Sequence, residues 1–226
     1  MTTITLVTLR ARTTLLAIAR RRLTVAILVA MPLVFYLVSH DAVGRAVRSL
    51  AFGLSWSIST VAFFAAQSAR ELEPRLGLAG ARRSHLLLGR LLGLLVAAAG
   101  LTTVFSLIVS IDEPRSMAGV VLDFAVTCLV AIGLGTAVGA LLDRELEGTL
   151  VLFFFAGLQA IVNPFDTYSR LLPFWSSREL GTFAVDGPDV GSLGDGLTHA
   201  AITLALCVVV VTVSLRGTAA RPSRLR

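Results

Sequence analysis

Long apolar runs, separated by short polar segments, fill most of this chain. Six of them approach the length of about 20 residues that a helix needs to cross roughly 30 Å of hydrocarbon. The six runs cover residues 23–38, 49–67, 91–111, 119–142, 149–165 and 196–215. Each is apolar on all sides, whereas a barrel strand would alternate polar and apolar positions over about ten residues. The pattern predicts an all-α membrane protein whose six transmembrane helices form one domain over residues 23–215.

The composition agrees with a bilayer as the main solvent of the chain. Of the 226 residues, 55% are hydrophobic and 15% are charged. The mean hydropathy of +0.83 exceeds what a soluble domain needs to fill one core. No stretch of the sequence predicts a separate soluble domain.

The positive charges are distributed unevenly between the two sides of this map. All 20 basic residues are arginine, and fifteen of them fall on the side of the N-terminus. The five on the other side are Arg45, Arg48, Arg115, Arg170 and Arg178. Because cytoplasmic segments are enriched in arginine, both termini are predicted in the cytoplasm, with the chain in the plasma (inner) membrane. Nucleic acid is not an expected partner, because the charges flank spans instead of forming one patch.

The two polar termini have patterns of their own. Within residues 1–22, apolar positions such as Ile4, Val7 and Ala11 recur at spacings of three and four. This periodicity predicts an interfacial helix on the inner leaflet, with a frayed tail as the alternative. Residues 216–226 are predicted to form a cytoplasmic basic tail.

The inner segment over residues 68–90 is too long for a simple hairpin. Glu71 and Glu73 suit the positive end of a helix dipole, and Arg82 and Arg83 suit its negative end. These charges predict a short helix at the cytoplasmic face. A solvated amphipathic turn with snorkelling arginines is the alternative.

The outer segment over residues 166–195 is apolar enough to contact membrane. It contains aromatic residues such as Phe174 and Trp175, and the preceding helix is predicted to end early at Asn163 and Pro164. Irregular backbone at membrane depth must pack against protein. The segment is therefore predicted to be re-entrant, with short helices against the bundle.

Enzymatic chemistry has little support in the residues. A P-loop needs a lysine to hold phosphates, and the sequence has none, so neither ATP hydrolysis nor a cofactor or metal is expected on this chain. An intramembrane serine protease is the sharpest enzymatic alternative, since Ser55, Ser57 and Ser59 share one run and His199 lies in another. The sequence around Ser55 lacks the G-x-S-[GA] turn of rhomboid proteases.

The residues inside the runs favour a role in helix packing over a role in ion-coupled transport. Asp123 and His199 are the ionisable residues within spans, and both are placed near outer ends, which disfavours ion coupling. Small residues recur at every fourth position in two runs, which predicts close helix packing. These columns are Gly89, Gly93 and Ala97, and Ala131, Gly135 and Gly139.

The segment after the second run carries an acidic pair, leucines, an arginine turn and a Gly-Arg end. The residues that make up this motif are Glu71, Glu73, Leu76, Leu78, Arg82, Arg83, Leu86, Leu87, Gly89 and Arg90. Together with the six runs, the motif resembles the ABC-2 type permeases. That family has six helices, both termini inside, a coupling helix after the second helix and a semi-re-entrant hairpin before the sixth.

The resemblance implies a permease subunit of an ABC exporter that moves a drug-like, lipid-like or peptide-like molecule. It implies a second permease copy or paralogue, and a separate pair of ATPase subunits that hold ATP and Mg. The residues it assigns to coupling are Glu71, Glu73, Leu76, Leu78, Arg82 and Arg83. A membrane scaffold or sensor, with residues 68–90 on another cytoplasmic partner, is the alternative function.

The resemblance also implies a substrate path at a dimer seam between the second and fifth helices. Polar and aromatic residues there suit an amphipathic cargo. They are Ser55, Ser59, Phe63, Phe64, Phe154, Phe155, Gln159 and Asn163. The alternative is that the aromatic residues face lipid and the polar ones bond neighbouring helices.

Overall fold

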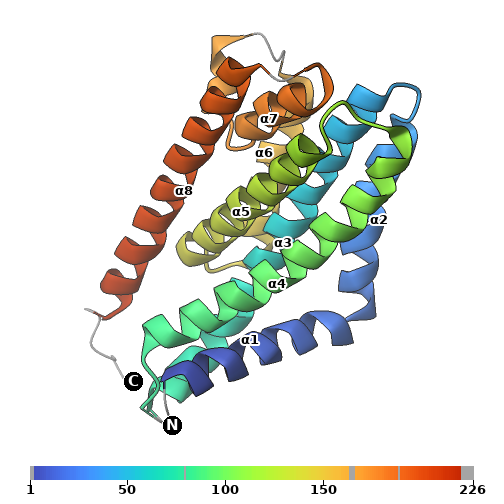
Figure 1. Ribbon diagram of the computed structural model, residues 1–226. Helices are drawn as coiled ribbons and strands as arrows, with labels where there is room; N and C mark the ends of the chain where they lie inside the picture. Colours follow the sequence, from blue (N-terminus) through green and yellow to red (C-terminus); the bar gives the residue numbers. More distant parts are fainter. Residues whose placement is uncertain (1–2, 79, 163–165, 188, 220–226) are drawn as a thin grey trace.

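The computed structural model is a bundle of helices (Figure 1). It describes residues 3–78, 80–162, 166–187 and 189–219. Over these residues the chain forms helices, turns and short connections, with no strand. The predicted all-α class is therefore confirmed.

Six of the helices cover most of the six apolar runs of the sequence. They are α2 (Arg22–Val38), α3 (Val43–Leu78), α4 (Arg83–Val109), α5 (Met117–Leu141), α6 (Glu145–Ile161) and α8 (Val190–Ala219). In the described part of the chain, α3, α4, α5 and α8 are long and apolar enough to cross a membrane. A fifth span results if α2 and the helix before it, α1 (Thr3–Arg20), are counted as one bent unit. Helix length and composition thus support four or five spans, and not by themselves the predicted six.

Helices α3 and α5 pack closely at the centre of the bundle because small residues line their contact. A Cβ atom added at Gly135 would lie 2.8 Å from the Cβ of Ala62, and one added at Gly139 would lie 2.5 Å from the Cβ of Ala66. Neither position has room for a side chain unless the helices move apart. The column that includes Gly135 and Gly139 therefore packs as predicted.

Helix α1 crosses the lower end of α4, at an angle of 73° to the segment from Thr24 to Val38 (Figure 1). The column of small residues that includes Gly89 and Gly93 makes this crossing possible. A Cβ atom at Gly89 would lie 2.6 Å from the Cβ of Arg10, and one at Gly93 would lie 2.8 Å from the Ala11 carbonyl oxygen. The predicted N-terminal helix is present, and its buried face packs on α4.

Helix α3 continues without a break through the segment for which a separate short helix was predicted. It ends at Leu78, and the chain then turns at Gly80, whose φ of 88° suits glycine. Alanine, leucine, arginine and glutamate dominate the residues after Gln67, and all four favour helix. The motif assigned to coupling thus lies on the end of α3, the following turn and the start of α4.

The outer segment forms two short helices, η2 (Thr167–Leu171) and α7 (Trp175–Val185). Helix α7 packs against α3, α5 and α8, with Leu180 and Ala184 fully buried. A Cβ atom at Gly119 of α5 would lie 2.9 Å from the Cα of Ala184, so α7 sits directly on the bundle. Short helices packed against the bundle were predicted here, and the structure contains them.

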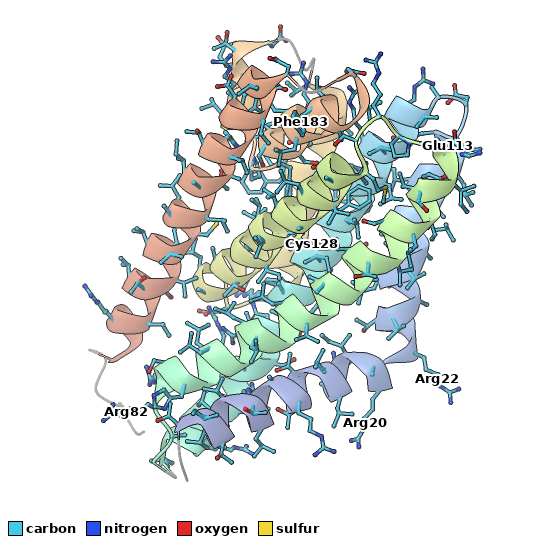
Figure 2. The ribbon with its side chains drawn as sticks, viewed as in Figure 1. Arg20, Arg22, Arg82, Glu113, Cys128 and Phe183 are labelled. Carbon is cyan, nitrogen blue, oxygen red and sulfur yellow. The ribbon has the colours of Figure 1, made fainter. Side chains whose placement is uncertain are left out.

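The two ends of the bundle differ in charge. Arg20, Arg22 and Arg82 lie at one end, which we call the arginine-rich end, whereas Glu113 and Phe183 lie at the other (Figure 2). We call the second end the α7 end. The start of α1 and the end of α8 both lie at the arginine-rich end (Figure 1). These three arginines thus lie at the same end of the bundle, as their positions along the sequence predict.

Candidate functional site

An open cavity of about 670 Å³ lies at the α7 end, between α2, α3, the last turn of α6, and α7. We call it the α7 cavity. Its volume is in the range of small-molecule pockets. The lining residues are Phe35, Val38, Ser39, Arg45, Arg48, Ser49, Phe52, Ser55, Gln159, Ala160, Val162, Ser169, Leu172, Phe174, Trp175, Ser177 and Arg178. The lining mixes aromatic, hydroxyl, amide and guanidinium groups, which suits an amphipathic molecule.

Two residues predicted for the substrate path meet in this cavity. Ser55 comes from α3, and its hydroxyl donates to the Phe52 carbonyl at 2.7 Å. Gln159 comes from α6, and its side-chain oxygen Oε1 is buried with no hydrogen-bond partner among the described residues. A buried amide oxygen without a partner carries a desolvation cost. Gln159 is therefore ready to accept a hydrogen bond from a ligand.

Aromatic rings, held by contacts with their neighbours, line the α7 cavity. Phe35 of α2 and Phe52 of α3 pack edge to face, with ring centroids 5.0 Å apart. On the opposite side, Phe174 and Trp175 are buried at the start of α7. The Arg170 guanidinium lies 5.3 Å from the centroid of the Trp175 ring, within cation–π range. These contacts hold the ring faces in place for an apolar ligand group.

The arginines of the cavity lining are partly balanced by carboxylates outside it. Arg48 pairs with Asp186 at the end of α7, and Arg45 pairs with Asp41 at 2.8 Å. Partial burial lowers the pKa of Arg178 from its ordinary value, yet a guanidinium remains charged at neutral pH. The α7 cavity thus combines three guanidinium groups with apolar and aromatic walls.

Ser59 and Phe63 lie on α3 below the cavity and are buried by neighbouring helices. The Ser59 hydroxyl donates to the Trp56 carbonyl at 3.0 Å, and its backbone faces Gly135 of α5. The Phe63 ring packs against Gly148 of α6. In this single chain both residues serve helix packing.

The remaining predicted path residues are spread along the bundle. Phe64 lines a separate pocket beside α1. Phe154 is 61% exposed, and Phe155 is half-buried next to it, with ring centroids 6.3 Å apart. Asn163 lies outside the described residues. Among the described residues of the predicted set, the structure thus brings together Ser55 and Gln159, and none of the others belongs to the α7 cavity lining.

The residues predicted for coupling lie together at the arginine-rich end. Leu76 is 37% exposed and Leu78 is 92% exposed on the last turn of α3. Arg82 and Arg83, both exposed, lie just across the turn, where α4 begins. Glu71 and Glu73 belong to α3, but their side chains are outside the described part of the structure. We call residues 75–78 and 80–83 the α3 end.

No protein-family model and no curated protein matches this sequence. The site is therefore interpreted from its own geometry.

No local pattern in the sequence predicts several residues of the α7 cavity. Arg48 and Phe52 lie one turn apart on α3, whereas Trp175 begins α7, and the packing of α7 on α3 brings Trp175 to them. A weak signal existed for Arg48, since an arginine at the edge of an apolar run must find polar neighbours. Nothing in the linear pattern indicated that α7 would form one wall.

The serine and histidine side chains considered for a protease do not bond one another. His199 Nε2 is 2.9 Å from the Arg170 carbonyl oxygen, and its ring packs on Trp175. The Ser55 hydroxyl is bonded to its own helix. The structure offers no serine–histidine pair among these residues.

Proposed function

We propose that this chain is the permease subunit of an ABC-type exporter and that the α7 cavity belongs to the path of an amphipathic cargo. The observation that carries the proposal is the extent of α3. One continuous helix places Phe52 and Ser55 in the α7 cavity and Leu76 and Leu78 at the exposed α3 end. The same helix therefore joins a ligand-sized cavity to a surface suited to a cytoplasmic partner.

The proposal places α2, α3, α4, α5, α6 and α8 across the membrane. Helices α2 and α6 each contain 17 residues, or about 25 Å at 1.5 Å per residue, which is at the short end of the range for a span. Helix α1 lies on the surface in this arrangement. It carries Arg10, Arg12 and Arg20, which would be costly inside hydrocarbon. The 73° bend after α1 agrees with a turn at the headgroup level.

The orientation follows from the arginines. Because positive residues favour the cytoplasmic side, the arginine-rich end faces the cytoplasm of the plasma (inner) membrane. Both termini then lie inside, and η2 and α7 lie at the outer face. The α7 cavity thus opens near the outer leaflet, where an exported amphipathic molecule would leave.

The α3 end is the proposed docking surface for a pair of ATPase subunits, which would bring ATP and Mg. Its exposed leucines offer apolar contacts, and Arg82 and Arg83 offer charge for orientation. The resemblance to ABC-2 permeases supports this assignment. A second permease copy or paralogue would cover the exposed aromatic face of α6, which includes Phe153 and Phe154.

The test uses the chain purified from its own host with any associated protein. We expect a P-loop ATPase to co-purify with it. Replacing Leu76 and Leu78 by serine should lower the amount of bound ATPase about tenfold, because central apolar contacts dominate binding energy. The matched control is Leu146→Ser, at a leucine of α6 that is 72% exposed at the same end of the bundle.

Two results would contradict the proposal. One is recovery of the chain from its host with a partner that has no ATPase domain, which would favour the scaffold or sensor alternative. The other is normal ATPase binding by the Leu76→Ser, Leu78→Ser variant together with loss of binding by Leu146→Ser. That outcome would move the docking surface away from the α3 end.

A further inference from the structure

A second cavity lies at the arginine-rich end, on the opposite side of α3 and α5 from α2. Its volume is about 350 Å³, and residues of α3, α4, α5 and α8 form its walls. We call it the α8 cleft. Figure 1 shows the lower half of α8 standing apart from α4, and the cleft lies in this region. Its described lining shares no residue with that of the α7 cavity, so the α8 cleft is a separate cavity.

The polar half of the α8 cleft is basic. Within the described part of the chain, its lining contains three arginines, Arg70, Arg83 and Arg90, and a single carboxylate, Asp143. Arg70 pairs with Asp143, which is highly exposed, and also donates to the Ala140 carbonyl at 2.8 Å. Because each guanidinium has five N–H donors, such bonds leave donors for a further acceptor. Among the described lining residues, guanidinium groups thus outnumber carboxylates three to one.

Two lining residues hold polar groups deep in the protein. Arg90 is 7% exposed, so its charge is kept within the bundle and not in bulk solvent. Thr136 is 3% exposed, and its hydroxyl has no hydrogen-bond partner among the described residues. The Thr136 hydroxyl is therefore a donor without a described acceptor, and the guanidinium groups beside it form charge-assisted hydrogen bonds to an anionic acceptor that enters the cleft.

The other half of the cleft is apolar. Ala66, Leu87, Val211 and Leu215 line it, with Val211 and Leu215 supplied by α8. No aromatic ring is found among the described lining residues, so a nucleobase would have nothing to stack on. A ligand that suits the whole cleft combines an anionic head with aliphatic chains.

We propose that the α8 cleft binds an anionic phospholipid of the adjacent leaflet, with its phosphate between Arg70, Arg83 and Arg90. Basic pockets between spanning helices on the cytoplasmic side bind lipid headgroups of this kind. The Thr136 hydroxyl donates to the same headgroup, and the acyl chains follow the apolar wall of α8. The inference needs the bundle to lie in a bilayer, but it does not need the chain to transport anything.

The experiment measures lipid binding to the purified full chain without an ATPase. The protein in a neutral detergent is titrated with phosphatidylglycerol or with phosphatidylcholine of the same acyl chains, and native mass spectrometry counts the bound lipid. We expect phosphatidylglycerol to bind about tenfold more tightly. Arg70→Gln and Arg83→Gln should each weaken its binding about fivefold, which corresponds to one near-surface arginine.

Two further variants make the test specific. Thr136→Val should weaken phosphatidylglycerol binding about fivefold without lowering the unfolding temperature, because the hydroxyl it removes has no internal bond. Arg82→Gln removes the same charge as Arg83→Gln from an exposed neighbour outside the cleft, and it should leave lipid binding unchanged.

Three results would overturn the proposal. Equal binding of phosphatidylcholine and phosphatidylglycerol would show that no anionic site exists. An equal loss of binding in Arg82→Gln would show that only general surface charge matters. Displacement of the lipid by millimolar inorganic phosphate alone would identify a soluble phosphate as the ligand instead. Because no ATPase is present, each outcome is separate from a failure of the exporter assignment.

Discussion

Polar groups inside the bundle differ in what they bond, and this difference decides which of them can serve a ligand. Ser55 and Ser59 each donate to a carbonyl three residues earlier on their own helix. Such bonds satisfy a hydroxyl without help from another helix. The Gln159 oxygen makes no hydrogen bond within the described structure and faces the α7 cavity. The Gln159 oxygen therefore gains a hydrogen bond only if a ligand enters that cavity.

The first prediction concerns this glutamine. Gln159→Leu should raise the cargo concentration needed for half-maximal ATP turnover about fivefold, because one hydrogen bond contributes about 1 kcal/mol. The amount of folded complex should not fall, since no internal bond is lost. Leu206→Ala on α8 is the control, because Leu206 is 62% exposed and lies outside the cavity lining. Normal turnover in Gln159→Leu with impaired turnover in Leu206→Ala would contradict the α7 cavity as part of the path.

At the scale of the helices, glycine positions determine which elements can touch. Gly135 and Gly139 let α5 approach α3, whereas Gly89 and Gly93 let α4 approach α1. Gly100 lies on α4 as well, but a Cβ atom there would have no neighbour within 4 Å. One helix thus contains both a glycine that packing requires and a glycine that packing does not.

The second prediction compares these two glycines of α4. Gly93→Ala should lower the free energy of unfolding by about 1 to 3 kcal/mol, because the new methyl group overpacks the contact with Ala11 and Thr14. Gly100→Ala should be neutral or stabilising, since alanine is the better helix former by about 0.8 to 1.0 kcal/mol. Thermal unfolding in detergent, followed by tryptophan fluorescence, measures both. Equal destabilisation of the two variants would mean that the α1–α4 contact is not tight.

The helices and the close contacts could be predicted from the sequence, whereas the residues that line the α7 cavity could not. Apolar runs and columns of small residues are local patterns, and they identified the helices and the packing of Gly93 and Gly135. Ser55 and Ser59 share one face of α3, yet the first lines a cavity and the second is covered by α5. That difference depends on where α5 and α7 cross α3, which is a tertiary property with no local signal.

At the scale of the whole molecule, the bundle has two chemically different ends with a cavity near each. The α7 cavity is framed by aromatic rings and lies beside η2 and α7. The α8 cleft is basic and lies among the arginines of the other end. This polarity is what a protein needs if one face meets the cytoplasm and the other does not.

The third prediction tests that orientation. In a variant with both Cys128 and Cys207 replaced by alanine, a single cysteine is introduced either as Ser84→Cys or as Val190→Cys. Both sites are exposed, the first at the arginine-rich end and the second at the α7 end. A membrane-impermeant thiol reagent on intact cells should label position 190 and not position 84. Labelling of position 84 from outside would reverse the proposed orientation.

The contact between α1 and α4 also has a consequence for how the protein is made. Helix α1 is synthesised before α4, and the residues that receive it, Gly89 and Gly93, are about 80 residues further along the chain. At roughly 5 to 20 residues per second, the ribosome needs about 4 to 16 s to reach them. During this interval the face of α1 that includes Ala11 and Thr14 has no protein to cover it. The membrane surface accommodates an amphipathic helix during this time, so α1 docks only after α4 has been made.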